Sequence, residues 1–190
     1  MNLQDFRKHG HVLVEWMADY LEQIDRFPVR SNAKPKEILN QLPAEAPEKG
    51  EPFEEIFRDF NEIVLPGITH WQHPGFFAYF PANSSPPSVL AEMLTATLGV
   101  QGMIWQTSPA AAELEERVME WLRAMLGLPR GFEGVIQDTA STATLCSLLT
   151  AREKFSDYAI NAGGFQKATA YTIYCSVQAH SSIEKAVKIA

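Results

Sequence analysis

The chain has 190 residues, of which 46% are hydrophobic and 21% charged, a composition typical of a globular protein. Its formal net charge of -7 argues against binding to nucleic acid or to an anionic membrane surface, because both favour a basic protein face. No apolar run approaches the roughly 20 residues that span a bilayer, and the first residues lack the pattern of a secretory signal. Cys146 and Cys175 lie in apolar segments, which indicates reduced thiols and a cytoplasmic protein.

The first third of the chain is predicted to contain two amphipathic helices. Apolar residues between 6 and 24 recur at three- and four-residue spacing, which predicts a helix that ends before Pro28. Residues 29–50 are polar and rich in proline, so they are expected to form an extended connector, with at most one short helix at 36–41. A second helix is predicted over residues 52–64.

Both of these helices present large apolar faces. Because a long connector separates them, we expect them to bury little against each other. A second subunit or another part of the protein is a possible cover for these faces, and ordinary packing within one subunit is the alternative.

An aromatic-dense loop follows at residues 70–85 and is expected to line a pocket or an interface. A helix is predicted from Pro86 to Leu98. The next helix is predicted to begin after Ser108, because serine is a favourable N-cap, and to end at Gly127.

The last third alternates between predicted strands and helices. Residues 134–137 and 170–175 are predicted strands, and residues 142–155 and 181–190 are predicted helices. This order predicts an α/β protein with a mostly parallel sheet. No glycine cap or polar tail follows the last helix, so we expect the fold to continue past Ala190.

Two polar positions lie where ligands bind in such a sheet, beyond the carboxyl ends of the strands. The turn at residues 138–142 precedes a helix whose N-terminus could hold a phosphate, although a simple N-cap role is the commoner use of such residues. His180 follows the second strand and could contact a ligand or cap the next helix. The pair His70 and His73 has no nearby acidic or cysteine ligand, so no metal site is expected.

Taken together, these segments resemble the group II decarboxylases that depend on pyridoxal phosphate (PLP), and most of all the aromatic L-amino-acid decarboxylases. Five blocks of sequence carry the resemblance: HPGFFAYFP at 73–81, WQTSP at 105–109, ELE at 113–115, GVIQDTAS at 134–141 and QAHSS at 178–182. They occur in the family's order, and the resemblance extends over essentially the whole chain.

The resemblance implies fold type I, the fold of aspartate aminotransferase, in an intertwined homodimer. Residues 1–85 would form a helical segment that wraps around the partner subunit. Residues 86–190 would form the first, incomplete part of the large domain that binds PLP. The lysine that carries PLP and the aspartate that contacts its pyridine nitrogen would both lie beyond Ala190, in a remaining C-terminal part on the same or a separate chain.

The resemblance also implies roles for individual residues near the cofactor. Thr139, Ala140 and Ser141 would bind the cofactor phosphate, and His180 would stack on the pyridine ring as the catalytic residue of this chain. Thr139 stands where animal members usually have serine, and Asp138 where they have glycine. The Asp-Thr version is similar to that of bacterial members.

For the substrate, the resemblance implies a flat aromatic slot, which suits an aromatic side chain. The residues that match the substrate pocket are Trp71, Tyr79, Phe80 and Pro81, together with Gln101 and Met103, which reach the partner subunit's pocket. Gln101 departs from the apolar residue of the family, which suggests a polar substituent on the substrate ring.

The expected reaction is decarboxylation of an aromatic L-amino acid to an amine and carbon dioxide. An aromatic aldehyde synthase on the same scaffold and a truncated, non-catalytic homologue that only dimerises are the alternatives. Glutamate decarboxylation is disfavoured, because residues 71–80 contain no arginine or lysine to meet a side-chain carboxylate.

Overall fold

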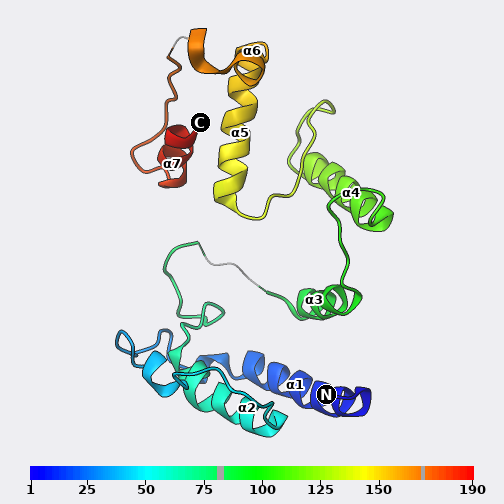
Figure 1. The fold of residues 1–190 in the computed structure, drawn as a ribbon, viewed down its shortest axis with the longest axis vertical. Helices are drawn as coiled ribbons and strands as arrows, with labels where there is room; N and C mark the ends of the chain where they lie inside the picture. The colour runs from blue at the N-terminus through cyan, green and yellow to red at the C-terminus, as the bar shows by residue number, and fades with distance from the viewer. Residues whose placement is uncertain (81–83, 168–169) are drawn as a thin grey trace. The chain divides into compact units, whose positions relative to one another are not determined.

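The computed structural model describes residues 1–80, 84–167 and 170–190, and its regular elements are helices (Figure 1). The chain divides into an N-terminal unit, Met1–Thr97, and a C-terminal unit, Leu98–Ala190. The α-helices are α1 (Leu3–Glu22), α2 (Phe53–Asp59), α3 (Pro86–Leu98), α4 (Pro109–Met125), α5 (Ala140–Phe155), α6 (Ala159–Gly163) and α7 (Ser182–Ile189). Shorter 3₁₀ or π segments are η1 (Ile24–Arg26), η2 (Leu39–Gln41), η3 (Phe60–Val64), η4 (Leu65–Gly67) and η5 (Gly164–Lys167). None of the described helices is both long enough and apolar enough to cross a membrane.

The predicted helices of the N-terminal unit are confirmed, with changes at their ends. The side chain of Asn2 caps α1 by accepting hydrogen bonds from the N–H groups of Gln4 and Asp5, both at 2.8 Å. The second helix begins at Phe53, one residue after the predicted start, with Pro52 as its N-cap, and it widens into the π segment η3 before the 3₁₀ turn η4 ends it. The connector contains one short helix, η2, within the predicted stretch.

Aromatic rings of α1 contact rings of the segment from α2 to η3, although no residue of α1, α2 or η3 is buried, which agrees with the expectation that these helices bury little against each other. The Trp16 ring lies 5.2 Å from that of Phe60 at 75°, and its Nε1–H donates a 3.0 Å hydrogen bond to Asn61 Oδ1. Near the other end, the rings of His9 and Phe53 stack at 4.1 Å.

Helices α3 and α4 match their predicted bounds. The Ser108 hydroxyl accepts a hydrogen bond from the N–H of Ala111, which satisfies one free donor at the start of α4. Gly127, with φ of 67°, reverses the chain just after α4 in a conformation that other residues rarely adopt.

The two predicted strands are not seen: among residues 1–80, 84–167 and 170–190 the structure contains no β-strand, and both 134–137 and 170–175 are irregular. A strand is defined by hydrogen bonds to a neighbouring strand, and these two segments do not pair with each other. The N–H of Ile136 instead donates a 2.8 Å hydrogen bond to the Glu115 carboxylate.

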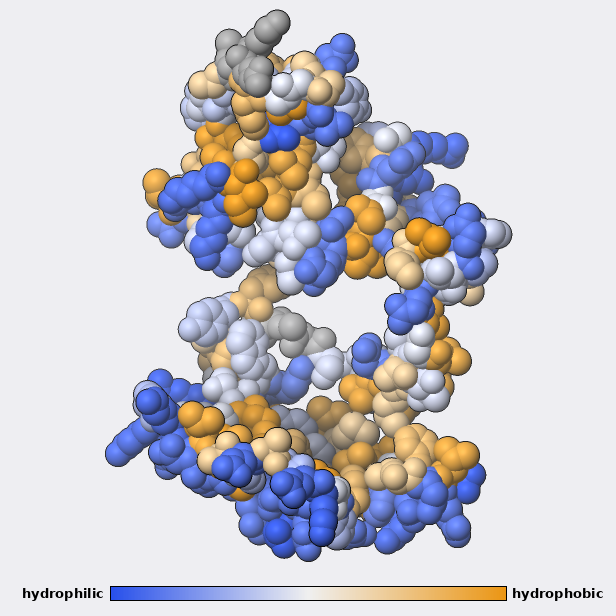
Figure 2. All heavy atoms as spheres, viewed as in Figure 1, coloured by the Kyte–Doolittle hydropathy of each residue, from blue (hydrophilic) through white to orange (hydrophobic). Residues whose placement is uncertain are grey.

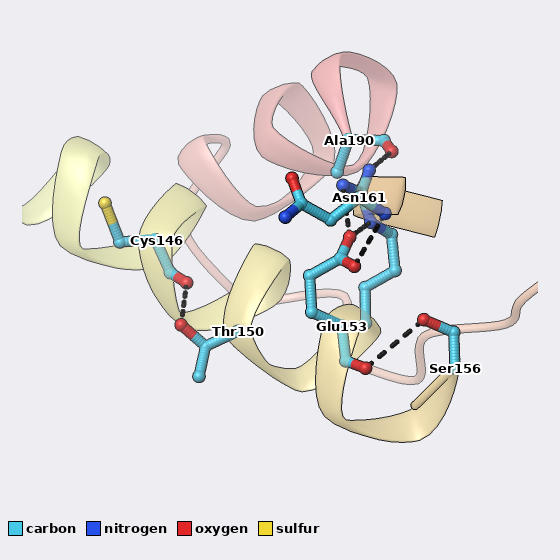
Figure 3. A network of polar contacts seen from close by, with 7 residues as sticks. Cys146, Thr150, Glu153, Ser156, Asn161 and Ala190 are labelled. Atoms are coloured by element: carbon cyan, nitrogen blue, oxygen red, sulfur yellow. Dashed lines mark hydrogen bonds and ion pairs between the residues drawn. The ribbon is translucent and has the colours of Figure 1, made fainter. Parts of the chain in front are cut away.

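In the C-terminal unit, α5 and α7 lie side by side (Figure 1). A polar network ties the end of α5 to α6 and to the last residue (Figure 3). Arg152 donates to Glu153 at 2.7 Å and to the carbonyl of Ala190, and Glu153 accepts a 2.9 Å hydrogen bond from the N–H of Asn161. These contacts hold the three helices together at this end.

Apolar side chains remain at the surface of both units (Figure 2). Of the apolar residues that the structure describes, Ile160 and Ala186 are the buried ones. A groove of about 930 Å³ runs between α5, the segment 170–173 and α7. Its apolar lining includes Leu148, Phe155, Tyr171, Ile173, Val187 and Ile189.

Candidate functional site

The start of α5 is built by a side-chain cap. Thr139 has an extended backbone, and its hydroxyl accepts a 3.1 Å hydrogen bond from the N–H of Thr142. The backbone carbonyl of Thr139 accepts from the N–H of Ala143 at 2.9 Å. The capping role that the sequence left open for Thr139 is therefore present in the structure.

The cap leaves the first backbone donors of α5 free. At the beginning of any α-helix the first N–H groups have no carbonyl four residues earlier in the helix, and here these include the N–H groups of Ala140 and Ser141. The Ser141 side chain is exposed at the same place. Because α5 is 16 residues long, its N-terminus also carries the partial positive charge that favours an anion.

His180 precedes α7 and caps it. Its Nδ1 accepts a 3.2 Å hydrogen bond from the N–H of Ser182 and lies 3.0 Å from the Ser182 hydroxyl. Acceptance at Nδ1 implies that the neutral ring carries its proton on Nε2. The capping alternative is thus present for His180 as well, and within the described part of the chain no aromatic ring stacks on its imidazole.

Three of the residues predicted to contact substrate lie in the N-terminal unit. The ring of Trp71 lies 5.9 Å from that of Tyr79 at an angle of 15°, and 4.8 Å from that of Phe76. Tyr79 adopts a left-handed backbone conformation, with φ of 57°, and Phe80 is 95% exposed. The structure therefore brings Trp71 and Tyr79 together, while Pro81 lies outside the described residues.

The other two predicted substrate residues lie near the start of the C-terminal unit. The carbonyl of Gln101 accepts a 2.6 Å hydrogen bond from the Thr107 hydroxyl, which closes the turn before α4. Met103 is exposed and lines a groove of about 600 Å³ together with residues such as Met119 and Phe132.

Glu113 and Glu115 have contacts that the sequence did not reveal. In the sequence they belong to one of the blocks that carry the family resemblance, but the sequence does not show their partners. In the structure Glu113 accepts a 2.9 Å hydrogen bond from the indole N–H of Trp105, and Glu115 holds the backbone of Ile136. Their spacing of two residues lets one helix bind the segments before and after it.

His70 lies in surroundings that the sequence did not predict. Its imidazole is 1% exposed and lies with Nδ1 2.8 Å from the Tyr20 hydroxyl, whereas His73 Nδ1 accepts from the N–H of Gly75. Burial lowers the pKa of His70, and repulsion from His73 lowers it further. The two rings have separate protein partners.

The chain is similar to a known protein family. The family model described as "Pyridoxal-dependent decarboxylase conserved domain" matches residues 35–190. The chain belongs to the pyridoxal-dependent decarboxylase family. The resemblance stated from the sequence blocks is therefore confirmed at the level of the family.

Curated relatives of this family member cover nearly the whole chain. It is 42% identical to phenylacetaldehyde synthase of Petunia hybrida, over 98% of this chain and 37% of that protein. It is 44% identical to aromatic-L-amino-acid decarboxylase of Sus scrofa, over 98% of this chain and 41% of that protein. The chain thus spans about two fifths of the length of these relatives.

Solved structures of the family share the fold of the chain. Tryptophan decarboxylase of Catharanthus roseus, in complex with L-tryptophan, matches with a TM-score of 0.90 and 36% identity. The 4-hydroxyphenylacetaldehyde synthase of Rhodiola rosea matches with a TM-score of 0.89 and 39% identity. Each match covers 100% of this chain and 41% of the other.

Proposed function

We propose that the protein carrying this chain is a PLP-dependent carboxy-lyase that converts an aromatic L-amino acid to the corresponding amine and carbon dioxide. The observation that carries this proposal is the family match over residues 35–190. Relatives named for acting on aromatic amino acids, at 41% to 44% identity, narrow the substrate class.

The groups at the start of α5 fit the cofactor's phosphate. The free N–H groups of Ala140 and Ser141, with the Ser141 hydroxyl, supply hydrogen-bond donors at a helix N-terminus, and Thr139 holds the turn in place. His180 lies at the start of the adjacent helix and, fixed through Nδ1 by Ser182, presents a flat ring for stacking. When bound there, PLP would act as the electron sink for the bond to carbon dioxide.

The aromatic-dense loop at residues 70–85, called the aromatic segment from here on, would contact the side chain of the substrate. Trp71 and Tyr79, stacked on each other, with Phe80 and Pro81 beside them in sequence, would make an apolar wall for the substrate ring. Gln101 and Met103 would reach the pocket of the partner subunit. This arrangement requires a homodimer in which residues 1–85 wrap around the partner.

Several further features belong to the same proposal. Segments 134–137 and 170–175 would become strands of the fold type I sheet once neighbouring strands supply the hydrogen bonds that they lack here. The remaining C-terminal part would supply the lysine that carries PLP and the aspartate at its pyridine nitrogen. The two free cysteines favour a reducing, cytoplasmic setting.

An aromatic aldehyde synthase is the second candidate, because two of the relatives described above carry that name. Such an enzyme consumes oxygen and releases an aldehyde, ammonia and hydrogen peroxide as well as carbon dioxide. The test is to supply the whole protein and PLP with L-tyrosine, L-phenylalanine, L-tryptophan or L-dopa and to quantify all of these products.

We expect amine and carbon dioxide in equal amounts, without oxygen uptake. Aldehyde with equal amounts of peroxide and ammonia would establish the synthase instead. If no substrate is consumed and no PLP becomes fixed to a lysine by borohydride reduction, the protein is a non-catalytic homologue and the proposal is wrong.

A further inference from the structure

A part-buried hydrogen bond in the N-terminal unit joins α1 to the aromatic segment. The hydroxyl of Tyr20, near the end of α1, lies 2.8 Å from Nδ1 of His70, which is 50 residues further along the chain. His70 is 1% exposed, and the tilted rings of Tyr20 and Phe27 lie 5.7 and 4.9 Å from its imidazole. Loss of this hydrogen bond is costly, because the buried imidazole of His70 cannot turn to water for another partner.

The backbone of His70 is held as well. Its N–H donates a 3.0 Å hydrogen bond to the carbonyl of Val29, in the segment that follows α1. Its carbonyl accepts a 3.0 Å hydrogen bond from the N–H of His73, which starts the next turn. Side chain and backbone together therefore attach His70 both to α1 and to the connector.

Trp71 is the next residue along the chain. It is the first residue of the proposed apolar wall, which Trp71, Tyr79, Phe80 and Pro81 would form around the substrate ring. Its ring lies 5.9 Å from that of Tyr79, at an angle of 15°, and it is 42% exposed. A single planar peptide unit joins His70 to Trp71, so a change in the position of His70 moves the backbone from which the Trp71 side chain extends. The Tyr20–His70 bond thus helps to place Trp71 although it does not itself belong to the wall.

We propose that Tyr20 and His70 are positioning residues, whose hydrogen bond holds Trp71 in the orientation that receives the substrate ring. This rests on the proposed function, in which Trp71 contacts an aromatic amino acid. The bond acts through Trp71 alone, so its loss should weaken substrate binding and leave the cofactor in place. Displacement of one binding group by a fraction of an ångström is enough to lower affinity severalfold.

The test uses the whole protein with PLP bound and the variant Tyr20→Phe, which keeps the ring and removes only the hydroxyl. The control is Tyr158→Phe, which removes an exposed hydroxyl in the other unit. We expect KM for the aromatic substrate to rise about three- to tenfold, as for the loss of one buried hydrogen bond. We expect kcat to stay within about twofold of the unaltered enzyme, the range of a change in binding alone, and the absorbance of bound PLP to be unchanged.

Hydrogen exchange read by mass spectrometry provides a measurement that does not depend on catalysis. In Tyr20→Phe the peptide that covers residues 70–80 should exchange faster, while peptides of 139–155 and 180–190 should be unaffected. If the unaltered protein turns over no aromatic amino acid, the proposed function fails, but the exchange result still decides the positioning role. Unchanged exchange at 70–80, or an unchanged KM in an active enzyme, would overturn the inference.

A second pair of variants decides the matter if Tyr20→Phe does not fold. In His70→Asn the side-chain amide lies where Nδ1 of the histidine was, so it can still bond to the Tyr20 hydroxyl. In His70→Gln the longer side chain carries its amide to the former position of Nε2, which does not face Tyr20. We expect His70→Asn to restore most of the substrate affinity and of the exchange protection at 70–80, and His70→Gln to restore neither. Equal behaviour of these two variants would show that the polar contact has no positioning role.

Discussion

Individual residues in the C-terminal unit combine capping with the proposed binding of PLP. Thr139 and His180 both cap helices, and these local bonds also fix the groups that would meet the cofactor. For His180 the two roles are compatible, because the cap uses Nδ1 and leaves the ring face for stacking. The capping bond therefore supports the proposed function by orienting the imidazole before PLP arrives.

The two roles of His180 can be separated by substitution. In the whole enzyme His180→Asn should keep a cap for α7, because asparagine is a good N-terminal acceptor, but it lacks the ring. We expect kcat to fall about 100-fold, an effect of the size that loss of orientation produces, with little change in the melting temperature. His180→Ala should lose the cap as well and be less stable by about 1 kcal/mol. Full activity of His180→Asn would exclude the stacking role.

Residue-scale predictions from the sequence succeeded where the cause is local. The Ser108 cap was predicted because an N-cap acts within three residues. The burial of His70 could not be predicted, because it depends on Tyr20 and Phe27, which are more than 40 residues away.

At the scale of elements, helical periodicity predicted every α-helix except α6 within a few residues. The predicted strands failed because a strand needs a neighbour, and no periodicity within one segment supplies it. The individual ring contacts of α1 with residues 53–60 could not be predicted for a similar reason. The sequence shows that both faces are apolar, but it does not show which rings meet.

The contact between α1 and the aromatic segment should depend on pH through His70. Burial lowers the pKa of His70 below its ordinary value of 6.5, so the unfolded chain binds this proton at a higher pH than the folded one. Stability is therefore complete above about pH 6.5, the ordinary histidine value, and falls as pH decreases towards the lowered pKa.

The prediction is checked by the urea midpoint of the whole protein between pH 7.5 and 5. Hydrogen exchange of the peptide that covers residues 70–80, measured over the same pH range, shows whether the loss of stability includes this contact. His70→Asn, which does not titrate, is the control and should lose part of the dependence. An identical pH profile for both proteins would contradict the assignment of this effect to His70.

At the scale of the molecule, 190 residues bury little apolar surface by themselves. Large side chains such as Leu94, Leu98 and Val177 are 65%, 73% and 97% exposed. Exposed apolar area on this scale marks surfaces that another part of a protein or a partner covers. The family resemblance predicts such cover, and the chain spans about two fifths of the length of the relatives described above.

The isolated segment 1–190 should consequently be insoluble or bind a hydrophobic dye strongly. Expression of this segment alone, followed by sedimentation and thermal unfolding, would check this. Co-expression with the remaining part of the protein is the matched control and should restore solubility. A soluble monomer that unfolds cooperatively would contradict the account of the uncovered surfaces.

The measurement that tests the central claim most directly compares PLP with pyridoxal, which lacks the phosphate, in the whole protein and in Ser141→Ala. If the phosphate binds at the start of α5, the variant should bind PLP about tenfold more weakly, as for a lost bond to a charged group. Its affinity for pyridoxal should be unchanged. Equal loss for both ligands, or no loss for either, would place the phosphate elsewhere and contradict the proposed site.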